Sequence, residues 1–248
     1  PDRDHTVKWL ASGLAPGQTY YYRFRLDREV SPIGRARTLP TGRLDRLGIA
    51  LASCSNFVFG YFNAYEAIAR DPAVDFVLHT GDYIYEYGVD EYPRTELAVP
   101  GRAFDPDHEI VTLDDYYRRY QQYHTDPNLL ALRAAKPISA TWDDHEIAND
   151  TWRDGAENHT PGAEGLWAQR KSDAIKAYYE WMPVRQPAAT GAPAPGGGAS
   201  SRKDTRTPMS GTTRASFSLR AMRTFTVALL RSAVGTMAIT SAGMRQSG

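Results

Sequence analysis

Side chains that commonly bind metal ions follow three apolar runs of this sequence. Cys54 follows the run 47–52, Asp82 follows the run 75–80, and Asp-Asp-His-Glu at 143–146 follows the run 137–142. Carboxylates held close together repel unless they are protonated or neutralised by a cation, and a thiolate strengthens that need. Thiolate with the phenolate of Tyr85 suits a highly charged transition metal such as iron, whereas carboxylate oxygens suit Ca²⁺. A carboxylate that bridges two cations is what two-metal phosphoryl transfer requires.

Each segment also has an interpretation without chemistry. A cysteine such as Cys54 is most often a small buried apolar residue. Gly81 followed by Asp82 is an ordinary turn after a strand. The segment 143–146 could be a solvated loop or the start of a helix. The metal interpretation is favoured because all three polar segments come directly after apolar runs.

The three apolar runs have the length and composition of buried strands. Between the first two, residues 61–70 show apolar residues at helical spacing and end at Asp71 and Pro72. Strand, helix and strand in this order predict a right-handed parallel crossover. Parallel strands end at the same edge of a sheet, which is where ligands bind in open α/β folds. The sequence therefore predicts an α/β (α+β) fold with its polar segments gathered at one edge.

Three further helices are predicted downstream. A capping box at 112–115 opens a helix that runs to about 123, and Asp126 with Pro127 opens another that runs to about 135. Residues 163–181 form an amphipathic pattern. The four tyrosines at 116, 117, 120 and 123 are interpreted as core packing. The proline-containing stretch 88–111 is expected to be a long surface loop.

The two ends of the chain differ from its middle. Residues 1–40 contain strand patterns typical of the late strands of a fibronectin type III-like sandwich, and 40–42 is interpreted as a linker to a domain at 43–187. Residues 188–248 are expected to be a low-complexity or frameshifted, poorly ordered tail, or else a basic tail for an acidic partner. Within it, 225–230 could form a strand or a short helix.

Composition bounds the function further. The chain has 42% hydrophobic residues, a formal net charge of zero and a single cysteine. These values indicate a globular protein with no internal disulfide and no field that favours nucleic acid. No apolar stretch is long enough to span a bilayer. We expect a monomer. Because the first residue is Pro1, we also expect that a preceding segment, with any export signal, is missing.

Taken together, the motifs resemble the PhoD family of alkaline phosphatases and phosphodiesterases. The resemblance rests on Ala-Ser-Cys-Ser-Asn at 52–56, Gly-Asp-Tyr-Ile-Tyr-Glu at 81–86, and Thr-Trp-Asp-Asp-His-Glu at 141–146 followed by Asn149. It covers about residues 5–187. It implies an N-terminal β-sandwich and a calcineurin-like metallophosphoesterase domain of αββα type, each present in part. It also implies Fe³⁺ and Ca²⁺, hydrolysis of phosphate monoesters and diesters in small molecules or polymers, and a periplasmic or extracellular location.

The resemblance also assigns roles to residues. Cys54, Asp82 and Tyr85 would be metal ligands, with Asp82 bridging, Asp144 would be a further ligand, and Asn149 would be a weaker candidate. Asp144 and His145 would be catalytic, since they stand where the superfamily has a metal-binding asparagine and a phosphate-contacting histidine.

The family completes its site with a downstream Gly-Asp-Val-His-like segment, whereas here no histidine follows His159. We therefore expect an incomplete site with little turnover. The alternatives are a non-catalytic remnant and a β-rich surface- or carbohydrate-binding protein.

Overall fold

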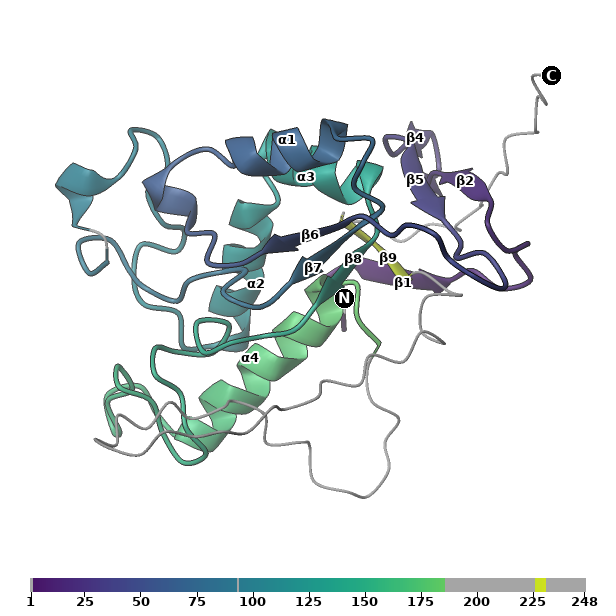
Figure 1. Cartoon of the computed structure of the whole chain (residues 1–248). Coiled ribbons are helices and arrows are strands. Elements are labelled where there is room, and N and C mark those ends of the chain that lie inside the picture. The colour runs from purple at the N-terminus through teal and green to yellow at the C-terminus, as the bar shows by residue number, and fades with distance from the viewer. Residues whose placement is uncertain (1, 93, 186–225, 231–248) are drawn as a thin grey trace, which may run out of the picture.

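The computed structural model describes residues 2–92, 94–185 and 226–230 (Figure 1). Its centre is a three-stranded sheet in the order β6-β7-β8, made of β6 (Ile49–Ala52), β7 (Phe76–His79) and β8 (Ile138–Ala140). Both pairings are parallel. The predicted strands and their parallel arrangement are confirmed, and the fold is mixed α/β.

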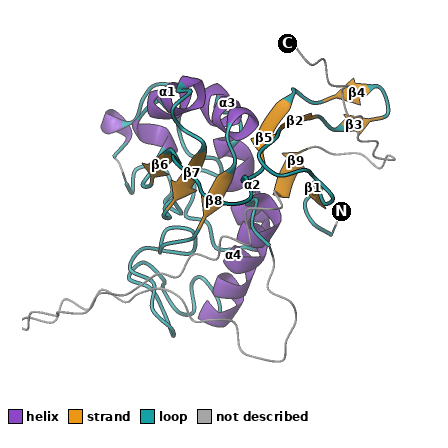
Figure 2. Cartoon of the chain, turned by 45° about the vertical axis from the view of Figure 1, so that its right-hand side comes forward, coloured by secondary structure: helices purple, strands orange, loops and turns teal. Residues whose placement is uncertain are grey.

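Helices cover both faces of this sheet. Helices α1 (Asn63–Arg70) and α3 (Pro127–Ala135) pack together on one side, and α4 (Trp167–Trp181) lies on the other, packed against α2 (Leu113–Tyr123) (Figures 1 and 2). Short 3₁₀ helices η1 (Phe57–Phe59) and η2 (Thr95–Leu97) interrupt the connecting loops. The sheet is thus a layer between helices, and the loops that follow the carboxyl ends of its strands carry the candidate site residues.

The helix starts follow the predicted capping signals. In α2, the Thr112 hydroxyl accepts from the Asp115 N–H and the Asp115 carboxylate accepts from the Thr112 N–H. In α3, the Asp126 carboxylate accepts from two N–H groups of the first turn. Helix α4 begins four residues later than predicted, because Gly165 adopts a φ of 78° and ends any helical path before it.

Aromatic side chains fill the core. Tyr116, Tyr120 and Tyr123 are all 0% exposed, and Trp181 stacks on Tyr120 with ring centroids 6.0 Å apart. The interpretation of these tyrosines as core residues is confirmed, whereas Tyr117 is half-buried and bonds to polar side chains of α4.

Two buried arginines, Arg102 and Arg119, hold the long loop 88–111 in place by ion pairing and hydrogen bonds. Arg102 forms an ion pair of 2.9 Å with Asp126, and both side chains are almost fully buried. Arg119 donates to the carbonyls of Asp105, Pro106 and Tyr85. Because buried guanidinium groups satisfy these carbonyls, the loop has a fixed path beside the strand ends.

The N-terminal residues form small antiparallel pairs. These are β1 (Thr6–Leu10) with β9 (Thr226–Leu230), β2 (Thr19–Tyr22) with β5 (Gly34–Arg37), and β3 (Arg25–Leu26) with β4 (Glu29–Val30). Among the described residues these pairs do not join into one sandwich, so the fibronectin-like arrangement is not confirmed. Strand β9 shows that the segment 226–230 pairs with the N-terminus. The rest of the predicted tail lies outside the described residues.

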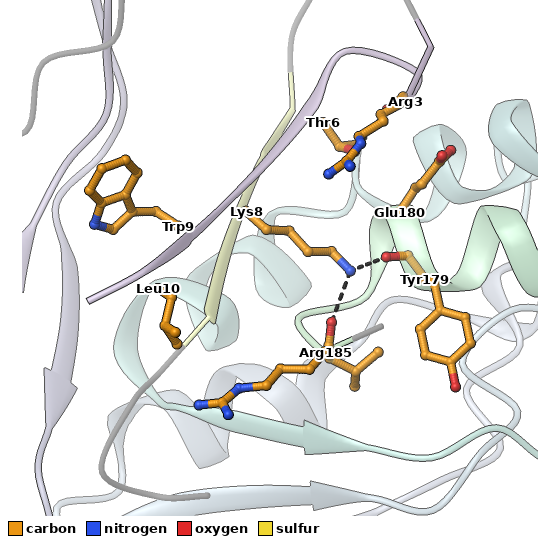
Figure 3. A pocket seen from close by; sticks show the side chains of 9 residues that line it. Arg3, Thr6, Lys8, Trp9, Leu10, Tyr179, Glu180 and Arg185 are labelled. Atoms are coloured by element: carbon orange, nitrogen blue, oxygen red, sulfur yellow. Dashed lines mark hydrogen bonds between the residues drawn. The ribbon is translucent and has the colours of Figure 1, made fainter. Parts of the chain in front are cut away.

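A cavity of about 290 Å³ lies between β1 and the C-terminal end of α4 (Figure 3). There the Lys8 ammonium donates to the carbonyls of Tyr179 and Val184, the latter at 3.0 Å. Burial lowers the pKa of Lys8 to about 8. The lining includes none of the predicted site residues, so this cavity is separate from the candidate site. None of the described helices has the length and apolar character of a membrane span.

Candidate metal centre

The loops after β6 and β7 are joined at the carboxyl edge of the sheet. The Cys54 N–H donates to the Gly81 carbonyl at 3.2 Å, and the Ser55 N–H donates to the Asp82 carbonyl at 3.0 Å. Cys54 and Asp82 both adopt left-handed backbone conformations, with φ of 55° and 53°. Such conformations cost free energy for residues with a Cβ and are often found at functional sites.

Gly81 allows the loops after β7 and β8 to approach each other. A Cβ at this position would lie 2.5 Å from Cβ and 2.6 Å from the backbone nitrogen of Asp143. Its φ of 114° also lies in a region that favours glycine. The close backbone contact therefore brings the segment after Asp143 next to Asp82.

Three of the predicted residues form a group that fits a metal ion. Asp82, Asp144 and His145 each offer a ligand atom, and these atoms lie within 4.8 Å of one another. Oδ1 of Asp82 is buried and has no hydrogen-bond partner among the described residues. Since a buried acceptor without a partner is costly, a bound cation would satisfy this oxygen. The residues present therefore fit a metal ion.

Cys54 and Tyr85 adjoin this group through Asp82. The Tyr85 hydroxyl donates to Oδ2 of Asp82 at 3.4 Å, and the Cys54 thiol interacts with both side chains. Burial and the Asp82 carboxylate raise the pKa of Tyr85 far above its ordinary value. A hydrogen bond with Ser53 lowers the pKa of Cys54, but burial and Asp82 outweigh it and raise the pKa overall. Both groups are thus protonated unless a cation replaces the proton.

Asn149 lies on the same loop as His145. Its amide nitrogen donates to Glu157, and its backbone N–H donates to Glu86 at 2.6 Å. Its role as a ligand stays a prediction. Asp143, between the strand and Asp144, is exposed, and its backbone N–H donates to Glu146 at 2.8 Å.

A buried carboxylate to which the sequence assigned no role orients His145. The Glu86 side chain is 0% exposed, and its Oε2 accepts from Nδ1 of His145 at 2.8 Å. Its Oε1 accepts from the Asn149 N–H and from Nδ2 of Asn158, at 2.6 and 2.9 Å. With Nδ1 held by Glu86, Nε2 of His145 is the nitrogen left for a ligand.

The charge of His145 follows from the same neighbours. Burial alone would lower its pKa, but the hydrogen bond and charge of Glu86, together with Asp144 and Asp82, raise the pKa to about 9. In this state His145 is an imidazolium at neutral pH and can donate a charged hydrogen bond.

A second buried carboxylate, Glu146, lies on the loop after β8 and binds the loop after β7. Glu146 is 1% exposed and accepts from the backbone N–H groups of Asp82, Tyr83 and Asp143, at 3.1, 2.7 and 2.8 Å. Glu86 therefore anchors the loop after β8, and Glu146 anchors the loop after β7. The signal for both was present in the motifs at 81–86 and 141–146, but apart from Asp143 their partners lie 59 to 72 residues away.

Comparison with known proteins agrees with these motifs. The family model described as PhoD-like phosphatase matches residues 49–204, which include the whole candidate centre. The chain belongs to the PhoD-like phosphatase family. A second model, for the N-terminal domain of PhoD-like phosphatases, matches residues 1–40.

One curated protein and one solved structure are similar over most of this chain. Alkaline phosphatase D of Bacillus subtilis (strain 168) is 41% identical over 187 residues, which are 75% of this chain and 31% of that protein. A solved structure of PhoD matches with a TM-score of 0.63 and 40% identity, and the match covers 70% of this chain and 32% of that one. The chain thus spans about a third of the length of each of these relatives.

Proposed function

We propose that this chain carries part of a metal-dependent phosphoesterase site that acts on phosphate monoesters and diesters. The supporting observation is the buried, unpartnered Oδ1 of Asp82 within reach of Asp144 and His145. A carboxylate in this position is suited to bridge cations, as phosphoryl transfer requires. The similarity to alkaline phosphatase D of Bacillus subtilis supports the reaction class.

The donor set supports iron and calcium as the metals. Cys54 and Tyr85 would supply thiolate and phenolate to Fe³⁺ beside Asp82, and the oxygens of Asp144 and Asn149 would suit Ca²⁺. When bound, such ions would activate water and stabilise charge on the transferring phosphoryl group.

The residues of the chain would act around that chemistry. Glu86 holds the imidazole of His145 so that Nε2 can donate to a phosphoryl oxygen. Glu146 holds the backbone on both sides of the centre and so sets the position of Asp82. These contacts provide the fixed donors that electrostatic catalysis needs.

We extend the proposal to the finer assignments. The sheet β6-β7-β8 would belong to an αββα metallophosphoesterase sandwich, and the N-terminal strands to a fibronectin-like sandwich. The family supports a periplasmic or extracellular location, and the protein would act as a monomer. The low turnover expected because no histidine follows His159 in this sequence stays a prediction.

The test compares Asp82→Asn with Asp114→Asn, the same change at an exposed position of α2. Metal content and release of p-nitrophenol from mono- and bis-p-nitrophenyl phosphate are measured on the purified full chain. We expect Asp82→Asn to lower bound metal at least tenfold and to abolish any turnover, with Asp114→Asn unchanged. Equal metal content in the two variants would contradict the proposed site.

A further inference from the structure

Aromatic side chains lead from His145 to the protein surface. The ring centroids of His145 and Tyr87 are 5.5 Å apart, those of Tyr87 and Tyr92 are 5.2 Å apart, and those of Tyr92 and Phe59 are 5.5 Å apart. We call Tyr87, Tyr92 and Phe59 the aromatic row. It joins the loop after β7 to η1.

The two outer rings of the row are more exposed than the inner ring. Tyr87 is half-buried, whereas Tyr92 is 48% and Phe59 45% exposed. Rings packed only as core would be buried like Tyr116 and Tyr120. The outer rings touch each other edge to face, at an interplanar angle of 75°. An exposed aromatic surface that is continuous with a polar site can hold a flat group.

We infer that the aromatic row is a subsite for a planar ring of a phosphate ester whose phosphoryl group lies at His145. This inference rests on the proposed function, since it takes His145 as the group that contacts phosphate. The shared chemistry is a phosphate attached to an aromatic ring, either an aryl group or a nucleobase. Stacking on exposed aromatic side chains accepts any ring with a π-face.

The charge around the row favours a small ester over a polyanion. Residues 88–97 contain three acidic residues and one arginine, so this loop carries more negative than positive charge. A polymer with many phosphates would be repelled along such a loop, because phosphate backbones bind through basic side chains. A single ester presents one phosphoryl group to His145 and its ring to the row.

The test measures binding of non-hydrolysable phosphonates to the purified full chain by calorimetry, so it does not depend on turnover. Phenylphosphonate carries a phenyl ring on phosphorus where methylphosphonate carries a methyl group. We expect the full chain to bind phenylphosphonate at least about fivefold more tightly, in line with the usual contribution of one stacked ring.

The double variant Phe59→Leu/Tyr92→Leu removes the ring faces but keeps apolar bulk. We expect it to bind both phosphonates equally, with the affinity for methylphosphonate unchanged, which shows that the fold is intact. The matched control is Tyr61→Leu, because Tyr61 is 59% exposed, lies two residues from Phe59 and contacts Arg102 instead of the row. This control should keep the fivefold preference.

The outcomes separate the two proposals. Equal binding of both phosphonates by the unsubstituted chain, or a preference that survives in the double variant, overturns the aromatic subsite and leaves the phosphoesterase proposal standing. Absence of binding for both phosphonates overturns both. Adenosine monophosphate and ribose 5-phosphate, compared in the same way, distinguish a nucleobase from an aryl group as the ring that the row prefers.

Discussion

The carboxyl edge of the central sheet and the N-terminal strand pairs are built in different ways. At the sheet edge, buried carboxylates reach across loops that are distant in sequence and bind backbone N–H groups. In the N-terminal region, two-stranded pairs leave apolar side chains in solvent, with Trp9 52% and Tyr21 58% exposed. Two-stranded pairs are weak by themselves. The difference indicates that side-chain placement at the sheet edge depends on buried polar contacts in addition to strand pairing.

The largest expected effect comes from Glu146→Ala. The change leaves three buried N–H groups without an acceptor, so we expect a loss of about 3–5 kcal/mol in the free energy of unfolding. Trp9→Ala in the N-terminal region should cost about 1 kcal/mol or less, since half of that side chain is already exposed. Urea denaturation of both variants measures the contrast. Glu146→Gln should not restore stability, because its NH₂ group would face an N–H donor.

The second effect is a dependence of stability on pH near the same edge. His79, at the end of β7, is 2% exposed, and burial lowers its pKa to about 4. A histidine whose pKa is lowered in the folded state stabilises the fold above its ordinary pKa, near 6.5. That stability is lost as the pH falls towards 4. As the pH falls from 8 to 5, we expect His79 to lower the free energy of unfolding by about 2 kcal/mol.

The measurement is the difference between the unsubstituted chain and His79→Gln at each pH. Burial raises the pKa of Glu109 and of Glu146 to about 7, which makes both favour the folded state at low pH and opposes the histidine in the total. The control is His108→Gln, whose side chain is 58% exposed. If His79→Gln and His108→Gln follow the same pH curve, the buried neutral state of His79 is wrong.

A smaller effect is expected for Glu86→Gln. The amide oxygen can still accept from Asn149 and Asn158, so the cost in unfolding free energy should be about 1–2 kcal/mol. The NH₂ group of the new side chain would face Nδ1 of His145. Nδ1 must then accept a hydrogen bond, so the ring proton of His145 lies on Nε2. Imidazole ¹⁵N shifts of metal-free protein should report loss of the proton from Nδ1 and a fall in the pKa of His145. An unchanged pKa would show that Glu86 does not control His145.

The sequence predicted the parts of the structure that depend on local pattern. The three parallel strands, the helix between the first two, and the caps at Thr112 and Asp126 are all confirmed. Each rests on residues within a few positions of one another. The gathering of Asp82, Asp144 and His145 followed from the rule that parallel strands end at one edge.

Contacts between distant segments could not be predicted in the same way. Nothing in the sequence pairs Glu146 with the N–H groups of Asp82 and Tyr83, because a backbone donor carries no residue-specific signal. The pairing of β1 with β9 joins residues more than 200 positions apart. The contact of Lys8 with carbonyls at the end of α4 is likewise set by tertiary packing.

Glu86 binds groups of the loop after β8, and Glu146 binds groups of the loop after β7. These reciprocal contacts limit how either loop can change in length. Glu86 reaches its partners from a fixed number of residues after Asp82, and Glu146 reaches its own from a fixed number after Asp143. An insertion in either segment would move its carboxylate out of reach of the other loop. The N–H donors of that other loop would then be left without an acceptor. A library of single-residue insertions should therefore be tolerated in the loop 90–97 and rejected throughout 82–86 and 143–146. At this edge of the sheet, the number of residues in 82–86 and 143–146 is therefore constrained as well as their identity.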